Sequence, residues 1–141
     1  MKVIYKQSNS PLVISIPHSG TDIPQDIAPL CNLAAKREHT DWALQELVTP
    51  LSETTLAATV SRYIVDVNRF KPRAGKTTQP IIPRIDEVGH HLFNNYPSKQ
   101  KQADWLERYY TPYYVHLENL LNEKLEQHER VLLVDLHSYD D

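Results

Sequence analysis

The sequence predicts an α/β domain with a mixed or mostly parallel sheet flanked by helices. Short, β-branched apolar runs alternate with segments of helical periodicity, and the strongest runs end at histidines. The length of 141 residues suits a single core. Charged residues make up 23% of the chain and hydrophobic residues 40%, which excludes a disordered or low-complexity protein. We therefore treat residues 1–141 as one α/β domain.

Two predominantly apolar runs predict strands far apart in the chain, and the first of them is expected to be buried. Residues 12–16 lie between prolines and lead to His18, and residues 131–136 lead to His137. Runs without polar alternation are typical of strands covered on both faces, as in parallel sheets. We expect the last strand to lie parallel to the first through a helical crossover.

Two further strand-like runs lie between these strands. Residues 56–60 and 63–67 are rich in β-branched and apolar side chains. They are interpreted as successive strands joined by residues 61–62, or as one bent strand.

Two segments predict amphipathic helices. Apolar residues recur at spacings near three and four within residues 41–51, where Thr40 or Asp41 could cap the start. Residues 99–129 carry a longer stripe, interrupted by Pro112. Because the stripe stays in phase across the proline, we expect one kinked helix, although Thr111-Pro112 would also serve to start a new one.

Proline-rich segments predict loops. Residues 19–29 should be a loop after the first strand, and residues 70–98 form a long excursion with no lasting periodicity. Loops of that length inside a domain are usually functional lids or mobile segments.

Composition excludes several classes of partner. The 15 Lys and Arg against 18 Asp and Glu give a net charge of -3 without a dense basic run, so no nucleic-acid partner is expected. No apolar run is long enough for a signal peptide or a membrane span. The single cysteine, Cys31, excludes an internal disulfide and a multi-thiolate metal site, and it suits a reducing compartment. We expect a cytoplasmic protein that does not associate with membranes.

His18 and His137 follow the ends of two predicted strands. Ligands of open α/β sheets bind beyond the carboxyl ends of the strands, so both imidazoles should lie at the same edge. Imidazole is the commonest zinc ligand, and a catalytic zinc takes three protein ligands. A carboxylate is the usual third ligand, and the candidates are Asp41, Asp22, Asp66 and Asp135. Of these, Asp135 is more natural as a group that orients a ligand.

The alternative is that these histidines only cap the strands or form hydrogen bonds. The five other histidines give weaker signals. His39 is ambiguous because it lies beside Asp41. The remaining four are expected to be solvent, lid or surface residues: His90, His91, His116 and His128.

Asn68 and Arg69 follow the strand-like run 63–67. The planar fork of arginine binds a carboxylate through two hydrogen bonds, and asparagine adds an amide beside it, so the pair suits an acidic small molecule. Arg62 could add a second positive charge. A salt bridge of Arg69 with Asp66 or with a helix carboxylate is at least as good an interpretation.

Four motifs resemble, in order, those of the N-formylglutamate amidohydrolase family. They are residues 11–20 (PLVISIPHSG), 40–42 (TDW), 61–69 (SRYIVDVNR) and 135–138 (DLHS). That family is similar in fold to the zinc carboxypeptidases and to the aspartoacylase and succinylglutamate desuccinylase group. The resemblance implies a phosphorylase/hydrolase-like, zinc carboxypeptidase-like sheet. It also implies a zinc-dependent hydrolase that converts N-formyl-L-glutamate to formate and glutamate in histidine breakdown.

Carried over residue by residue, the resemblance implies a site for zinc and for a small acidic substrate. His18, Asp41 and His137 would bind zinc, with Asp41 chosen as the carboxylate ligand. Asn68 and Arg69 would hold a substrate carboxylate with help from Arg62. The zinc would polarise the formyl carbonyl and lower the pKa of its bound water.

Three departures from the family pattern affect this interpretation. His39 stands where the family has an acidic residue, and Tyr114 stands where histidine is common. Family members run well beyond the His-Ser motif, and the general-base glutamate of the related peptidases lies in that later part; nothing in the spacing of Glu87 argues for it as a substitute. We therefore expect an incomplete set of catalytic residues, and we expect residues 131–136 to form an unpaired edge of the sheet. The chain would then be a fragment, or it would complete its sheet by association.

Two other classes of function stay open. The chain could be a binding module that keeps the pocket for an acidic small molecule without catalysis. It could also be a structural domain that forms a homo-oligomer through the long Tyr- and Leu-striped helix.

Overall fold

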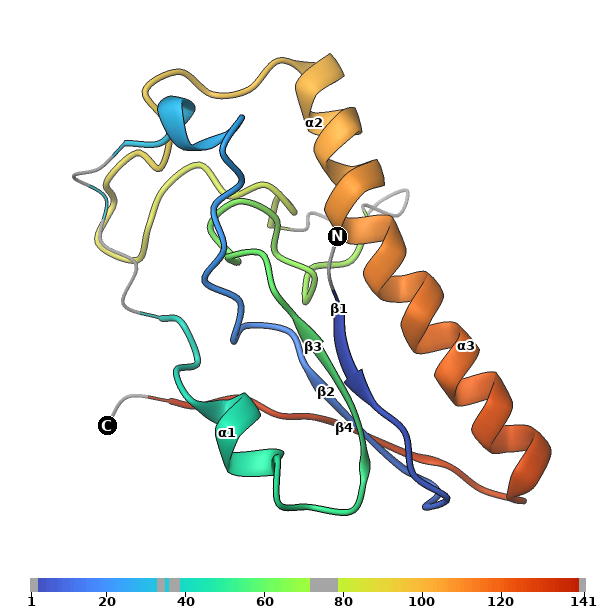
Figure 1. Cartoon of the computed structure of the whole chain (residues 1–141). Helices are drawn as coiled ribbons and strands as arrows, with labels where there is room; N and C mark the ends of the chain where they lie inside the picture. The colour runs from blue at the N-terminus through green and yellow to red at the C-terminus, as the bar shows by residue number, and fades with distance from the viewer. Residues whose placement is uncertain (1–2, 33–34, 36–38, 72–78, 140–141) are drawn as a thin grey trace.

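A four-stranded mixed sheet forms the centre of the computed structural model, which describes residues 3–32, 35, 39–71 and 79–139 (Figure 1). The strands lie in the order β1-β3-β2-β4. Their bounds are Val3–Lys6 for β1, Leu12–Ile16 for β2, Thr54–Ala58 for β3 and Leu132–Asp135 for β4. β2 is parallel to both β3 and β4, and β1 is antiparallel to β3. The α/β class, the mixed sheet and the parallel pairing of the first and last predicted strands are thus confirmed.

Helices cover both faces of the sheet. A short helix, α1 (Leu44–Val48), packs on β2 and β3 through Leu44 and Val48. The long helix is formed by α2 (Lys99–Trp105), the π-helical segment η2 (Leu106–Tyr110) and α3 (Thr111–Gln127). The long helix packs on the other face. Successive residues of a strand point to opposite faces, and in β3 the side chain of Leu56 belongs to the core cluster of the long helix, whereas that of Ala57 belongs to the cluster of α1. A 3-10 turn, η1 (Ala28–Leu30), follows the first loop.

The long helix passes Pro112 without a break, as the phase of its apolar stripe predicts. Proline has no N–H, and its ring clashes with the carbonyl four residues earlier in a regular α-helix. The wider π turn just before the proline relieves this conflict, and the Thr111 N–H bonds to the Leu106 carbonyl five residues back. Ser98 caps the start of the helix through the Lys101 N–H.

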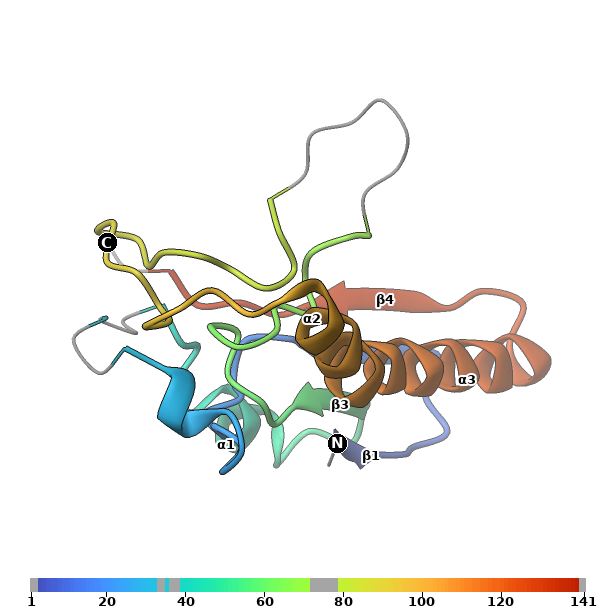
Figure 2. The ribbon, with the colours of Figure 1, turned by 90° about the horizontal axis from the view of Figure 1, so that it is seen from above.

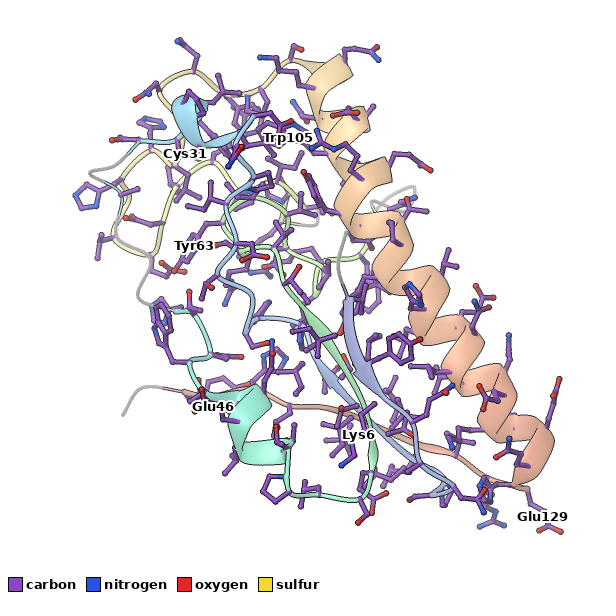
Figure 3. All side chains as sticks on the ribbon, in the orientation of Figure 1. Lys6, Cys31, Glu46, Tyr63, Trp105 and Glu129 are labelled. Atoms are coloured by element: carbon purple, nitrogen blue, oxygen red, sulfur yellow. The ribbon has the colours of Figure 1, made fainter. Side chains whose placement is uncertain are left out.

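The predicted strand 63–67 is wrong. These residues form turns, in which the Ile64 N–H donates to the Ser61 carbonyl over 2.9 Å and the Asp66 N–H donates to the Ile81 carbonyl over 2.7 Å. The apolar side chains are nevertheless buried, and Tyr63 belongs to the same core cluster as Trp105; both are labelled in Figure 3. An apolar run can therefore be a buried turn when distant carbonyls accept its N–H groups.

Other element bounds differ from the predictions. The helix expected over 41–51 is limited to α1, because Ala43 has a left-handed backbone with φ of 60°, and neither Thr40 nor Asp41 caps it. The strand expected over 56–60 begins two residues earlier, at Thr54. Residues 19–29 are largely loop, as predicted. The described part of the excursion 70–98 contains only isolated bridges and turns, and residues 72–78 lie outside the described residues.

β4 is an edge strand, as predicted for residues 131–136. In Figure 2, which shows the molecule from above, β4 and β1 lie at the two opposite edges of the sheet. All four residues of β4 are exposed, and Leu132 is 62% exposed. Among the described residues, no helix has both the length and the apolar character that crossing a membrane requires.

Gly20 is required by the close approach of two backbones. A Cβ on this residue would lie 2.6 Å from the Thr59 carbonyl carbon and 2.7 Å from its oxygen, and it would also meet the Val60 carbonyl oxygen. Since these are backbone atoms, Gly20→Ala should destabilise the protein by about 1–3 kcal/mol, which urea unfolding would measure. Gly89→Ala is the comparison, because a Cβ there meets nothing within 4 Å and adds only the strain of a φ of 93°. An equal or smaller loss for Gly20→Ala would contradict the explanation.

Candidate functional site

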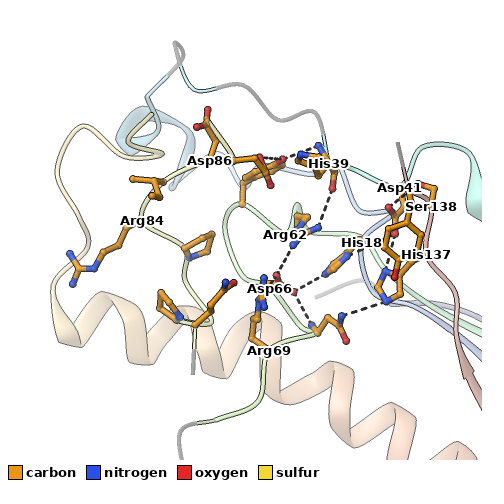
Figure 4. A pocket seen from close by; sticks show the side chains of 18 of the residues that line it. His18, His39, Asp41, Arg62, Asp66, Arg69, Arg84, Asp86, His137 and Ser138 are labelled. Atoms are coloured by element: carbon orange, nitrogen blue, oxygen red, sulfur yellow. Dashed lines mark hydrogen bonds and ion pairs between the residues drawn. The ribbon is translucent and has the colours of Figure 1, made fainter. Parts of the chain in front are cut away.

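Three side chains from distant parts of the chain meet beyond the carboxyl ends of β2 and β4. His18 follows β2, His137 follows β4, and Asp41 precedes α1, where its N–H donates to the His18 carbonyl over 3.1 Å. One potential ligand atom from each residue lies within 4.8 Å of the others. The structure thus brings together the three residues that the sequence suggested as metal ligands (Figure 4).

Asp41 lies between the two imidazoles. Its Oδ2 is 3.2 Å from Nδ1 of His137 and 3.9 Å from Nδ1 of His18. Its other oxygen accepts a hydrogen bond from the Ser138 hydroxyl over 2.9 Å. His18 and Asp41 are buried, so the three groups form a compact, preorganised cluster of nitrogen and oxygen donors.

Asp66 contacts the ring nitrogen of His18 that points away from Asp41. Nε2 of His18 lies 2.8 Å from Oδ1 of Asp66, and an ionised carboxylate can only accept, so Nε2 carries the proton. In the neutral form of the ring, the lone pair is therefore on Nδ1, the nitrogen nearer Asp41. A carboxylate behind a histidine is the usual outer partner of a metal ligand, and two imidazoles with a carboxylate suit zinc. The residues present therefore fit a zinc ion.

The other candidate carboxylates lie elsewhere. Asp66 was a candidate ligand by sequence, but its contacts make it the group that orients His18. Asp135, expected in that orienting role, lies on exposed β4 opposite Ser15. Asp22 pairs with Val60 in a short bridge, and neither Asp22 nor Asp135 lines the pocket.

Asp66 also accepts hydrogen bonds from two arginines. A terminal nitrogen of Arg62 and Nε of Arg69 each lie 3.2 Å from its Oδ2. The salt bridge that was the alternative interpretation of Arg69 is thus present. Burial raises the pKa of the Asp66 carboxyl, but the hydrogen bond and charge of His18 together with the charge of Arg62 outweigh it and hold the pKa below its ordinary value.

Arg69 and Asn68 keep polar groups available to a ligand. The pairing with Asp66 uses only Nε of Arg69; among the described residues no protein group accepts from its two terminal nitrogens. The side chain of Arg69 is 36% exposed. The Asn68 side-chain amide lies 3.4 Å from Nε2 of His137, next to the three-residue cluster.

These residues line a pocket of about 1060 Å³. Part of its wall comes from the proline-rich excursion, including Glu87, whose carboxylate accepts a hydrogen bond from the Tyr63 hydroxyl over 2.9 Å. His39 and His91 also line the pocket. The predictions for His90, His91 and His116 as exposed residues are confirmed, whereas His128 is half-buried.

Sequence reasoning missed two contributors to the site. The orienting role of Asp66 has a local signal, because the Asn68 N–H donates to its Oδ1 over 3.0 Å in an Asx turn that the Asp-x-Asn pattern favours. Tyr63 has no such signal, since it lies inside an apolar run and reaches Glu87 only through the fold.

Proteins of one known family are similar to this chain in sequence. The family model described as N-formylglutamate amidohydrolase matches residues 10–141. The N-formylglutamate deformylases of Pseudomonas aeruginosa and Pseudomonas putida are 33% and 31% identical over 143 residues, which cover 95% of this chain. The chain spans 54% of the length of each of these relatives, or about half.

Solved structures are similar as well. The crystal structure of N-formylglutamate amidohydrolase from Ralstonia eutropha JMP134 aligns with a TM-score of 0.72 at 25% identity, covering 97% of this chain and 56% of that one. A gene product of Agrobacterium tumefaciens aligns with a TM-score of 0.78 over the same shares of the two chains. At 18% identity, this second likeness is one of fold alone.

The contact with Asp66 fixes which nitrogen of His18 carries the proton. In the metal-free protein, we expect the neutral His18 ring to carry its proton on Nε2, because the acceptor-only carboxylate lies at that nitrogen. The ¹⁵N shifts of the imidazole nitrogens would show it. Asp66→Asn should weaken this preference, since an amide can donate as well as accept. A neutral wild-type His18 ring that carries its proton on Nδ1 instead of Nε2 would contradict the assignment.

Proposed function

The chain belongs to the N-formylglutamate amidohydrolase family, and on that premise we propose that it acts on N-formyl-L-glutamate or a similar N-acyl acidic amino acid. The reaction is hydrolysis to formate and glutamate, with zinc bound by His18, Asp41 and His137. The observation that carries the proposal is the convergence of these three side chains at the edge of the sheet. The names of the two Pseudomonas relatives support the substrate.

Zinc held by these residues supplies Lewis-acid chemistry: it polarises a carbonyl and makes water acidic enough to attack near neutral pH. The chain's own residues prepare the site for that role. Asp66 accepts the Nε2 proton of His18, which leaves Nδ1 of the neutral ring for the ion, and the Ser138 hydroxyl fixes one oxygen of Asp41, so that the other faces the imidazoles. A bound ion would replace the contact between Nδ1 of His137 and this second oxygen, while the outer partners of His18 and Asp41 stay in place.

The basic side of the pocket binds the substrate carboxylate. The terminal nitrogens of Arg69 face no protein acceptor among the described residues, and a guanidinium binds a carboxylate through two parallel hydrogen bonds. Arg62 adds positive charge through its side chain, which is 17% exposed. Because Asp66 contacts both Arg69 and His18, the distance between the carboxylate-binding group and the metal ligands is set through one residue.

The cellular setting is part of the same proposal. A protein that removes the formyl group of N-formylglutamate would act in histidine breakdown. The lone cysteine, Cys31, supports a reducing compartment and hence the cytoplasm.

One observation favours a second candidate, a binding module for an acidic small molecule. Of the four carboxylates that line the pocket in the described part of the chain, Asp41, Asp66 and Asp86 are each paired with a histidine, which leaves Glu87, bonded to the Tyr63 hydroxyl through one oxygen. A general base must be able to take a proton from water, and positioned proton transfer typically contributes about 100- to 10,000-fold in rate. The binding module would keep the acidic ligand and zinc but release no formate.

Formate release from N-formylglutamate in the presence of zinc tests the enzymatic function. We expect His18→Ala and His137→Ala each to lower turnover by at least about 100-fold, because loss of an outer partner alone costs about 10- to 100-fold. Metal analysis of the same samples should show less zinc per chain. The matched control is His116→Ala, an exposed histidine on α3 that stacks on Tyr5. Turnover that stays unchanged in both site variants would end the zinc assignment.

Calorimetric titration with N-formylglutamate separates the two candidates. Arg69→Ala should weaken binding by about 10-fold or more, since hydrogen bonds to charged groups contribute about 1.5–3 kcal/mol. Binding that depends on Arg69 without any formate release favours the binding module, and binding with release favours the hydrolase. Arg108→Ala is the control, because that arginine pairs with Asp26 and Asp104 on the surface and does not line the pocket. Equal affinity in Arg69→Ala and the wild type would remove Arg69 from the site.

A further inference from the structure

We propose that Tyr110 and Tyr114 are positioning residues for substrate binding. Their hydroxyls hold the backbone on both sides of the Asn68-Arg69 pair and so fix the carboxylate-binding group relative to the metal ligands. The inference rests on the proposed function, which assigns Arg69 to the substrate carboxylate.

Two hydrogen bonds carry the inference. The Tyr114 hydroxyl donates to the carbonyl of Val67, and the Tyr110 hydroxyl donates to the carbonyl of Arg69, each over 2.8 Å. These carbonyls bracket Asn68 and Arg69. On the pocket side the same two residues are bound by Asp66, whose Oδ1 accepts from the Asn68 N–H over 3.0 Å and whose carbonyl accepts from the Arg69 N–H over 3.1 Å. The segment is therefore fixed from both sides.

The side chains of residues 63–67 are buried in the core, whereas those of Asn68 and Arg69 are not. Residues 63–69 form turns and irregular backbone, so no strand ladder holds Asn68 and Arg69 in place. Arg69 extends from this turn into the pocket, and a shift of its backbone would move the guanidinium relative to His18 and His137. Because a misplacement of about 1 Å can cost about 100-fold in rate, a binding group on a turn needs rigid neighbours. The two hydroxyls, fixed on a long helix, provide them.

The helix presents both tyrosines to the same segment. Residues four apart lie on one face of a helix, and the rings of Tyr110 and Tyr114 contact each other at a tilt of 34° with centroids 4.7 Å apart. Tyr110 is the last residue of the π-helical segment η2, and Tyr114 lies in the first turn of α3, so the two tyrosines flank the junction at Pro112. Burial raises the pKa of Tyr114 far above its ordinary value, so that this hydroxyl keeps its proton at neutral pH and can donate it.

Tyr113 offers a matched control on the same helix. It is more deeply buried, at 2% exposure, and its hydroxyl lies 2.8 Å from the Ser15 hydroxyl in β2. Removal of its hydroxyl takes one buried hydrogen bond from the fold but none from residues 67–69. It therefore separates loss of stability from loss of positioning.

Calorimetric titration of the zinc-loaded protein with N-formylglutamate tests the inference. We expect Tyr110→Phe and Tyr114→Phe each to raise the Kd for N-formylglutamate by about three- to tenfold, with a larger rise in the double variant. Zinc affinity should stay unchanged, and in an active preparation KM should rise while kcat stays constant. Tyr113→Phe should lower the unfolding midpoint in urea but leave the Kd within about twofold. Hydrogen exchange at the amides of Asn68 and Arg69 should speed up only in the Tyr110 and Tyr114 variants.

The outcomes distinguish this inference from the proposed function. A wild-type protein that binds N-formylglutamate with the same Kd as both Tyr110→Phe and Tyr114→Phe would overturn the inference alone. An equal rise in Kd for Tyr113→Phe would overturn it as well, because general loosening would then explain the effect. A wild-type protein that binds neither zinc nor N-formylglutamate would overturn the proposed function, and the inference with it.

Discussion

The site depends on one buried carboxylate, that of Asp66, which is only 3% exposed. A buried anion is stable only when it is paired and hydrogen-bonded, and here its partners are His18, Arg62, Arg69 and the Asn68 N–H. The first of these is a candidate metal ligand, and the others belong to the basic side of the pocket. The need to pair the buried Asp66 carboxylate therefore sets both the orientation of the His18 imidazole and the position of the Arg69 guanidinium. A change at Asp66 would affect the candidate metal ligands and the basic side of the pocket together.

The second constraint is the parallel register of β2 and β4. Ser15 lies opposite Asp135, and the Leu136 N–H donates to the Ser15 carbonyl over 2.8 Å. Parallel strands end at the same edge, so the histidines that follow them reach the same place from positions far apart in sequence. Asp41 joins them because its own N–H binds the His18 carbonyl, which places its side chain beside both rings.

The sequence was sufficient for the features that depend on strand ends and motif order. The α/β class, the parallel first and last strands and the meeting of His18 with His137 follow from apolar runs that each end at a histidine. The turn at 63–67 could not be predicted, because a buried turn and a buried strand need the same apolar side chains. They differ only in their hydrogen-bond partners, which here are the distant Ile81 carbonyl that accepts from the Asp66 N–H and the Tyr114 hydroxyl that donates to the Val67 carbonyl. The early part of the predicted helix 41–51 failed at Ala43, whose left-handed backbone has no signal in a residue type that usually favours helices.

The candidate ligands do not have equal structural support. His18 follows a strand paired on both sides, with β3 and β4, and its ring is held by Asp66. His137 follows β4, which pairs only with β2 among the described strands and exposes all four of its residues. Local opening begins where few buried contacts hold an element. The position of His137 thus rests on the register with β2 and on the contacts of His137 and Ser138 with Asp41. Any group that covers β4 would therefore act on the candidate metal site through this histidine.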